Sequence, residues 1–506
     1  MINPAYSPTS SAARSSALMQ DLRATMMDLQ RQLSTGQKAA TYGGLGPDRF
    51  TALNLQARLS QMTGYSNVIQ SSSLRLTLMD KSMSGLNDIV KNAQSAATSA
   101  TYEPNAAGRT IAQVSADDQL KMMIDLMNTD SAGQYLFSGR ATDVKPVAGY
   151  DEMINGAAGK AGLKQMIAER QAADLGTGGL GRLTPPSLSG TTVTLERDAA
   201  NPGPFGFTIS SATTSSASIS LSGPTGPQQT TTVGFTAQPA DGDSVSLSLT
   251  LPDGSTKTIT LTASSDTPAA TGSFAIGATT AATAANFQSA LQSELASASK
   301  TSLTAASSLT ASKAFFAGSP SSPPMRVPSP AAAATGLVAG TDADTVIWYR
   351  GDDDTTAYPN ARTTAVAKVG DALSVGVGAR ANEQAVQQSF AMLAALSLTD
   401  VAPSDPDGKT RYAELANRVR QGLSFPDGMQ SITGMSAELA SANAAIKTAK
   451  DRMTASKNVL TNSLGDISTA DPQETTAALL ALQTRLQATY ATTAALSRLS
   501  LVNYLS

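Results

Sequence analysis

The sequence predicts a multidomain chain that is mainly α-helical at both termini, as a long bundle or coiled coil, and that carries a central β-rich insert. Apolar residues alternate at spacings of three and four over 76–97 and again over 432–460, the heptad pattern of packed helices. Between these regions SVSLSLTLPDGSTKTITLT (244–262) alternates polar and apolar residues, which indicates β-strands. The segment 199–312 contains only two basic residues, Lys257 and Lys300, so its composition differs from that of its flanks.

The composition excludes several classes of chemistry. The 506 residues include no cysteine and no histidine, which removes disulfides, thiolate nucleophiles, imidazole bases and Cys or His metal sites. The net charge of −3 favours neither nucleic acid nor an anionic membrane as a partner. No run of 18 apolar residues predicts a membrane span, and no apolar stretch with a cleavage site predicts classical secretion. We expect a protein that is not an enzyme and needs no cofactor or metal.

The N-terminal third predicts three helices. Ser10 or Ser11 can cap the first helix, and Gly36 interrupts it. The glycine- and proline-containing stretch 39–49 predicts an ordered turn, after which a second helix begins near Asp48. A third helix follows YEPN and carries Leu120, Met123 and Met127. The apolar stripe of the first helix consists of Leu18, Leu22, Met26, Leu29 and Leu33, and that of the second consists of Leu76, Met79, Met83, Leu86, Val90, Ala93 and Ala97.

The C-terminal part predicts two further helices. The heptad pattern that begins at Ile432 extends to Ile467, and Asp471 and Pro472 break it. It then resumes to the end of the chain at Leu479, Leu482, Leu486, Thr489, Thr493 and Leu496.

Apolar residues are concentrated in the last eleven positions, where chains usually fray. Burying one such side chain is worth about 1.5 to 3 kcal/mol, so we expect some surface to cover them. They are Leu496, Leu499, Leu501, Tyr504 and Leu505.

The central insert predicts a β-hairpin around PDGS, with Val245, Leu247, Leu249 and Leu251 on the packed face opposite Ile259 and Leu261. A short helix with Phe287, Leu291 and Leu295 follows. The Pro- and Ser-rich stretch 319–330 predicts a linker that closes the insert, and 345–359 predicts a second strand region.

Three short features have a functional and a structural interpretation. Arg350–Gly351–Asp352 is a cell-attachment string, but a polar turn explains it better. Asp352, Asp353 and Asp354 lack the spacing of a calcium loop, so a solvated turn is favoured over a metal site or paired acids. Trp348 fits a packed strand residue better than a sugar-stacking platform.

The heptads themselves allow an intramolecular bundle, a dimeric coiled coil, or helices that pair with copies in an assembly. They contain many Ala, Ser and Thr residues where a stable free coiled coil has Leu and Ile, and they run to the ends of the chain. Such marginal helices suit folding on assembly.

Three stretches resemble the bacterial flagellin family, and are closest to its hook–filament junction proteins (hook-associated protein 3). LQRQLSTGQKAATYGGLG (29–46) is similar to the family's LSTG signature. AGQYLFSGRATDVKPV (132–147) resembles its Y-[LI]-F-x-G strand entry, here Tyr135, Leu136, Phe137 and Gly139, with the TDVKP of junction proteins. LSRLSLVNYLS (496–506) resembles the ending of a junction protein. The resemblance covers about 10–147 and 430–506, with weaker support over 346–396. The family's DDP is replaced by YGGLGPDR, and the insert is large for a junction protein.

The resemblance implies a secreted, extracellular structural subunit of the flagellum, exported unfolded through the type III apparatus without signal cleavage. Its partners are then hook-associated proteins, flagellin and copies of itself, with a chaperone before export. We expect a terminal helical assembly domain (1–45 and 471–506), a helical rod (46–147 and 400–470), an intermediate β-containing domain (148–189 and 331–399) and the insert (190–330).

The expected assembly interface is Leu18, Leu22, Met26, Leu29, Leu33, Leu479, Leu482, Leu486, Leu496, Leu499, Leu501, Tyr504 and Leu505. Filament flagellin is the first alternative, because filament subunits carry comparable inserts. An extracellular adhesin on a helical stalk is the second, and a hydrolase that uses Asp352–Asp354 is the last.

Overall fold

The computed structural model describes residues 8–99, 101–199 and 203–505, and side chains within 13–495. It confirms a mixed fold of helices and several sheets. The chain forms two compact units. Unit 1 comprises Met1–Ser71, Lys368–Ser374 and Ala445–Ser506, and unit 2 comprises Ser72–Ala367 and Val375–Ala444.

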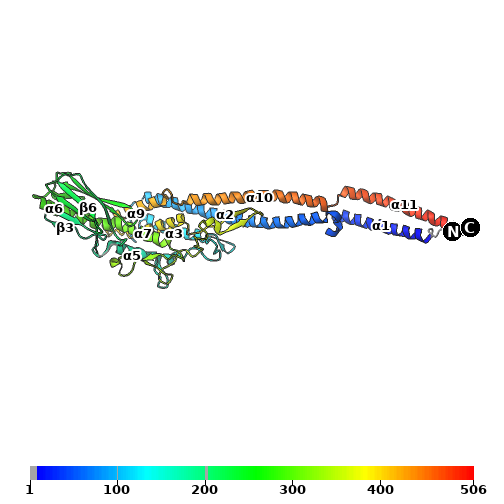
Figure 1. The fold of residues 1–506 in the computed structure, drawn as a ribbon, viewed down its shortest axis with the longest axis horizontal. Helices are drawn as coiled ribbons and strands as arrows, with labels where there is room; N and C mark the ends of the chain where they lie inside the picture. The colour runs from blue at the N-terminus through cyan, green and yellow to red at the C-terminus, as the bar shows by residue number, and fades with distance from the viewer. Residues whose placement is uncertain (1–7, 100, 200–202, 506) are drawn as a thin grey trace. The chain divides into compact units, whose positions relative to one another are not determined.

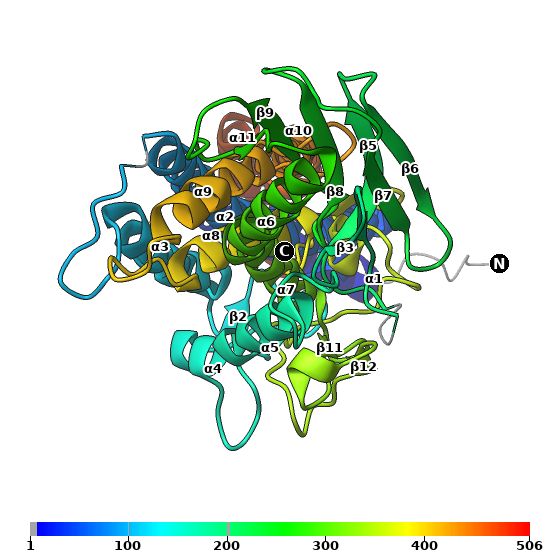
Figure 2. The same ribbon diagram turned by 90° about the vertical axis from the view of Figure 1, so that its left-hand side faces the viewer.

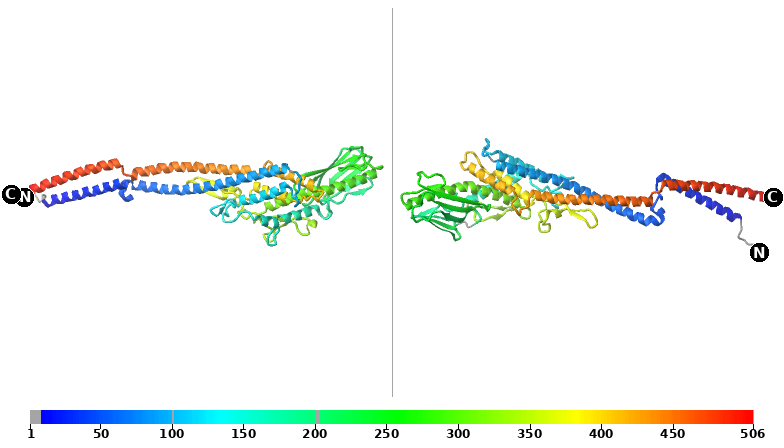
Figure 3. Two further views of the ribbon diagram at one scale, coloured as in Figure 1. Left: turned by 180° about the vertical axis from the view of Figure 1, so that it is seen from behind. Right: turned by 90° about the horizontal axis from the view of Figure 1, so that it is seen from above.

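Unit 1 contains two long terminal helices, α1 (Pro8–Thr35) and α11 (Pro472–Leu505), which lie side by side (Figures 1 and 3). Gly36, with φ of +67°, ends α1, and its carbonyl accepts from the Ala470 amide at 3.0 Å. Asp471 caps α11 by accepting from the Gln473 amide at 2.8 Å, and Pro472 occupies the first helical position, where it costs no hydrogen bond. The predicted interruptions at Gly36 and at Asp471–Pro472 are therefore confirmed.

The two inner helices contribute residues to both units. The predicted turn before the second helix is the 3-10 helix η1 (Tyr42–Asp48), and α2 (Arg49–Thr98) starts directly after it. Helix α10 covers Ile432–Ser468. All seven predicted residues of the α2 stripe from Leu76 to Ala97 are buried, as are Ile432, Met435, Leu439, Ala442, Ile446 and Ala449 of α10.

Unit 2 also contains α6, described with the sheets below, and the helices α3 (Ile111–Met127), α4 (Tyr150–Asn155), α5 (Leu163–Leu175), α7 (Thr304–Ala317), α8 (Gln384–Leu398) and α9 (Gly408–Leu423). Helix α3 begins with a capping box in which Thr110 and Gln113 each bond the other's backbone amide. Helix α7 packs against α5, α8 and α9. At its end Phe316 stacks on Phe390 of α8, and both contact Trp348, which is fully buried as the sequence predicts.

Two four-stranded sheets are formed by the strands between Ser187 and Ala275, of which β3 precedes the predicted start of the insert at 190. One has the order β3 (Ser187–Ser189), β4 (Thr192–Leu195), β7 (Thr230–Phe235), β6 (Ile219–Thr225). The other has the order β10 (Ser273–Ala275), β9 (Thr256–Ser264), β8 (Ser244–Thr250), β5 (Thr208–Thr214). Helix α6 (Thr280–Ala298) contacts strands of both sheets (Figure 2).

The hairpin around PDGS is confirmed. Strands β8 and β9 pair antiparallel, with Val245 opposite Leu261 and Leu247 opposite Ile259. These side chains are buried with Phe287, Leu291 and Leu295 of α6, because the pleat places every second residue on the same face.

Two expectations, one for the end of the insert and one for the segment after it, are wrong. Residues 345–359 form no extended strand, since only isolated bridges occur, from Ala161 to Thr345 and from Val147 to Tyr349. The stretch 319–330 is more than a linker: β11 (Met325–Arg326) pairs with β12 (Val338–Ala339), and Val327 is buried. The remaining short elements are β1 (Asp130–Ser131), β2 (Gln134–Tyr135), η2 (Ser299–Leu303), η3 (Ala331–Ala333), η4 (Ala361–Thr364), β13 (Val366–Lys368) and β14 (Ser374–Gly376).

Candidate assembly interface

Helix α1 presents a covered face that differs by one residue from the predicted stripe. Leu22 is 7% exposed, and Met26 and Leu29 are half-buried. Leu18 is 49% exposed, because Met19 rather than Leu18 lies on the covered face in this part of α1. Ser15, one turn earlier, is half-buried on the same face. The set 15, 19, 22, 26, 29 alternates four and three, whereas the predicted 18, 22, 26 uses two spacings of four. Leu18 therefore lies outside the seam, a correction that the strict heptad would have supplied.

Leu33 keeps the heptad phase of Met19 and Met26, yet it is 43% exposed. It lies in the last turn of α1, two residues before Thr35 ends the helix. A residue in phase with a seam is thus left uncovered where the helix pair ends.

The covered face of α11 is the one that the spacing predicts. Leu486 is 6% exposed, and Leu479 and Leu482 are half-buried, as are Thr489 and Thr493. The other described residues between 476 and 495 are exposed. The side chains of Leu496, Leu499, Leu501, Tyr504 and Leu505 lie outside the described part of the structure, although α11 extends to Leu505.

Polar contacts join the two terminal helices. Arg23 of α1 donates from Nε and Nη2 to the Tyr490 hydroxyl of α11, at 3.1 and 2.6 Å. With Gly36 bonded to Ala470, this contact shows that α1 and α11 run antiparallel. The Arg23–Tyr490 pair was not predicted from the sequence, because neither residue lies on an apolar stripe.

The terminal helix pair buries few of its apolar side chains. Of the eight predicted interface residues whose side chains are described, only Leu22 and Leu486 are buried. Met27 and Leu480, which no prediction included, are exposed as well. The pair therefore offers apolar surface that a further helix can cover.

The Asp352 side chain is not solvated, which corrects the expectation of a solvated turn at this residue, whereas Arg350 and Asp354 keep exposed side chains. The Asp352 side chain is 7% exposed and forms ion pairs with Arg140 at 2.8 Å and Arg380 at 3.2 Å. Burial alone raises the pKa of Asp352, but the hydrogen bonds from Arg140 and Arg380 outweigh it and hold the pKa at about 2. The Arg350 guanidinium in turn pairs with Glu152. Within the cell-attachment string, Gly351 and the Asp352 side chain are therefore buried, whereas the Arg350 side chain is exposed.

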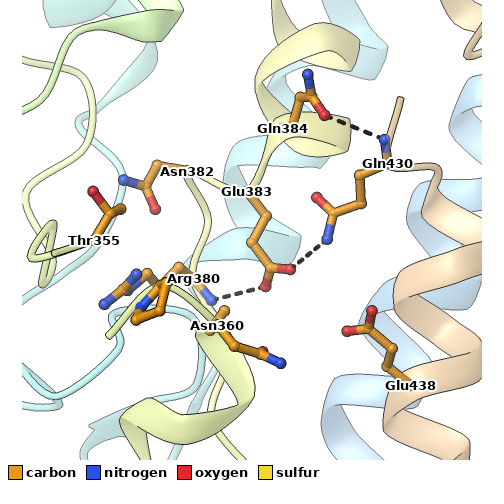
Figure 4. A pocket seen from close by; sticks show the side chains of 10 residues that line it. Thr355, Asn360, Arg380, Asn382, Glu383, Gln384, Gln430 and Glu438 are labelled. Atoms are coloured by element: carbon orange, nitrogen blue, oxygen red, sulfur yellow. Dashed lines mark hydrogen bonds between the residues drawn. The ribbon is translucent and has the colours of Figure 1, made fainter. Parts of the chain in front are cut away.

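A polar hollow of about 430 Å³ opens beside the start of α8 (Figure 4). Glu383 lies at its centre and accepts hydrogen bonds from Arg362 at 2.7 Å, Gln430 at 2.9 Å and the Arg380 amide at 3.2 Å. The Gln384 side-chain oxygen accepts a hydrogen bond from the backbone amide of Gln430 at 3.2 Å (Figure 4). These bonds tie the start of α8 to the segment that precedes α10. The carboxylate is saturated with donors, so its arrangement is that of a structural junction rather than of a general base.

Within the described ranges, no three acidic side chains gather closely enough to hold a metal ion. No helix among the described residues has the length and apolarity to cross a bilayer. No protein-family model, curated protein or solved structure matches the chain.

Proposed function

We propose that the chain is a non-catalytic structural subunit of the bacterial flagellum, whose terminal helices assemble with helices of neighbouring subunits. The incomplete seam between α1 and α11 carries this proposal. Leu18, Met27 and Leu480 are exposed although they are large and apolar, and Thr489 and Thr493 occupy seam positions. Neighbouring helices would bury this surface and stabilise the pair.

A position at the hook–filament junction is the specific form of the proposal. It rests on the stretches 29–46, 132–147 and 496–506, which resemble junction proteins. The partners would be hook-associated proteins, flagellin and further copies of the chain, preceded by an export chaperone that covers the C-terminal cluster. The chain would act outside the cell, without binding nucleic acid or membrane.

The proposed organisation is a terminal helical bundle around a central β-rich insert. Helices α1 and α11 would form the assembly domain, and the inner helices α2 and α10 would contribute to the rod. The sheets between β3 and β10 would be displayed away from the assembly.

Filament flagellin remains the second candidate, because two four-stranded sheets make a large insert. The adhesin rested on the Ser- and Thr-rich insert and on the Arg350–Gly351–Asp352 string, and it loses the second of these, since the Asp352 carboxylate is paired with Arg140 and Arg380.

The test replaces three exposed apolar residues of the terminal helices together, as Leu18→Gln, Met27→Gln and Leu480→Gln. Because these side chains are exposed, the monomer should keep its melting temperature, while electron microscopy of cells that carry the variant should show no incorporation into flagella. Leu188→Gln, Met325→Gln and Val338→Gln form a matched control, since they are exposed apolar residues outside the terminal helices. Normal incorporation of the first variant would contradict the proposal.

Gold labelling of a tagged copy separates the two flagellar candidates. A junction protein should be labelled once per flagellum, between hook and filament. Labelling along the whole filament would identify flagellin, and labelling only on the cell surface would overturn both.

A further inference from the structure

The polar hollow beside the start of α8 contains hydrogen-bonding groups that the fold itself does not use (Figure 4). Three separate stretches of unit 2 form its walls, 355–361, 380–384 and 430–438. Its volume of about 430 Å³ falls within the range of about 300–1,000 Å³ that small-molecule sites occupy. Most ligand pockets have apolar walls, but most side chains that line this hollow are amides, hydroxyls or carboxylates. The hollow therefore suits a polar ligand.

Two amide side chains of the hollow are held in place by the backbone. The Asn360 side-chain oxygen accepts from the Arg362 backbone amide at 2.8 Å, and the Gln384 side-chain oxygen accepts from the Gln430 backbone amide at 3.2 Å. Because a backbone donor engages each oxygen, the free end of each side chain is its NH2 group. Among the described residues neither nitrogen has an acceptor, and both side chains are exposed. Both NH2 groups are therefore oriented and available to a ligand.

Asn382, Thr355 and Arg380 add polar groups that lack a partner. The side chains of Asn382 and Thr355 lie next to each other (Figure 4) and bond no other residue in the described part of the chain. Asn382 is half-buried, so the fold removes part of its hydration without replacing it. The Arg380 side chain is 3% exposed, and its Nε also has no acceptor among the described residues. Buried polar groups are nearly always paired in folded proteins, so unpaired ones beside a hollow point to a ligand.

The charges around the hollow are paired within the fold. Arg380 is the only cation among the described residues that line it, and it pairs with Asp352 at 3.2 Å. Glu383 is bonded by Arg362 at 2.7 Å, and Glu438 lies 3.2 Å from the same guanidinium. The Glu438 side chain is 52% exposed and points from α10 into the hollow (Figure 4). An anionic ligand would therefore find no free cation, whereas the Glu438 carboxylate can accept from a hydroxyl.

We propose that the hollow is a binding site for a neutral saccharide. Sugar hydroxyl groups both donate and accept, so one ligand can satisfy the free NH2 groups of Asn360 and Gln384 together with the Glu438 carboxylate. A carboxylate ligand only accepts, and it would repel Glu438. An apolar ligand would leave the amides buried without partners, which costs free energy. Because the backbone orients two of the amides before binding, less ordering is required of the site. This inference does not depend on the proposed function.

Saturation-transfer difference NMR on the full chain tests this inference. The probes are glucose, galactose, mannose and N-acetylglucosamine, each as the free sugar and as its methyl glycoside, with acetate as a charged probe. We expect at least one sugar to bind with a Kd on the order of 1 mM, and acetate to give no signal. Binding of a methyl glycoside would identify the end of a glycan chain as the ligand, and binding of the free sugars alone would identify a free sugar. The absence of a signal from every sugar would overturn the inference, as would tighter binding of acetate.

Two variants of the hollow and one control locate the binding. Asn382→Ala should weaken sugar binding by on the order of tenfold and leave the melting temperature unchanged, because this side chain bonds the ligand and no described residue. Thr355→Trp, at an exposed position, should abolish binding by filling the hollow, and it serves if Asn382→Ala fails to fold.

Asn87→Ala on α2 is the matched control, because Asn87 is also half-buried without a described partner but lies outside the hollow. It should bind sugar like the unmodified chain. Sugar binding that both hollow variants retain would overturn the inference, as would an equal loss of binding in Asn87→Ala.

Discussion

The terminal helix pair and the helical layer of unit 2 share one sequence pattern and differ in how deeply they bury it. In α2 the heptad residues Leu76, Met79, Met83 and Leu86 are all 1% exposed or less. In α11 the heptad residues Leu479 and Leu482 are only half-buried. Periodicity therefore identifies the face of a helix that packs, but the depth of burial depends on how many neighbours pack on it. Helix α2 packs against α3, where Leu126 lies against Gly85. Helices α1 and α11 pack against each other.

The largest expected effect comes from truncating one heptad leucine in each region. Leu86→Ala should lower the free energy of unfolding of unit 2 by about 2–5 kcal/mol, because it leaves a cavity in a closed core. Leu482→Ala should cost about 1 kcal/mol or less, because its side chain is already half-hydrated. Chemical denaturation followed by circular dichroism measures both. Equal losses would show that the two regions are packed alike.

Acid should weaken unit 2 through Asp352, whose folded pKa of about 2 lies below the ordinary value of 3.8. A group with a lowered pKa stabilises the fold above its ordinary pKa, and this contribution is lost as the pH falls from about 4 to about 2. Asp352→Asn should abolish this loss and lower stability at neutral pH by on the order of 3 kcal/mol, since it leaves Arg380 buried without its partner. Denaturation midpoints between pH 7 and pH 2 test this. An unchanged pH profile in the variant would show that other carboxylates dominate.

Two neighbouring residues of α1 test which face of the terminal pair is packed. Met19→Gln should speed amide exchange in 15–33 and 475–493, because Met19 lies in the seam. Leu18→Gln should change stability by less than about 0.5 kcal/mol, because Leu18 is exposed. Hydrogen exchange with mass spectrometry measures both variants. A larger effect of Leu18→Gln than of Met19→Gln would show that Leu18 lies on the packed face, as the predicted spacings of four imply.

The smallest effect on the isolated chain is expected at its C-terminal end. The proposed flagellar assembly predicts that replacing Leu499, Leu501 and Leu505 by Ser leaves the melting temperature of the monomer unchanged and abolishes incorporation into flagella. In an assembly the same changes would remove burial worth on the order of 5 kcal/mol. In the unmodified monomer, amides before Leu45 and after Asp471 should also exchange faster than those of 432–464. A destabilised monomer that still assembles would place the cluster within the protein's own core.

Local patterns predicted the terminal helices α1, α2, α3, α10 and α11, the insert helix α6 and the central hairpin, but not α4, α5, α7, α8 or α9. The long-range partners of individual side chains could not be predicted. Alternation around PDGS defines both strands and their register, because a short turn leaves little choice of pairing. The burial of Asp352 depends on Arg140 and Arg380, which lie far away in the sequence and belong to no motif. The one-residue shift at Leu18 has a different origin, since Leu18 and Met19 are both apolar and only the partner helix selects between them.

The single tryptophan has a practical consequence for all of these measurements. Trp348 lies in unit 2, is fully buried and donates its indole N–H to the Phe316 carbonyl at 3.0 Å. Its fluorescence therefore reports on unit 2 alone, and melting of α1 and α11 should leave the emission unchanged. Far-ultraviolet ellipticity, by contrast, records every helix. The difference between the unfolding transition followed by ellipticity and the one followed by tryptophan fluorescence therefore measures the loss of the terminal helices, without any label.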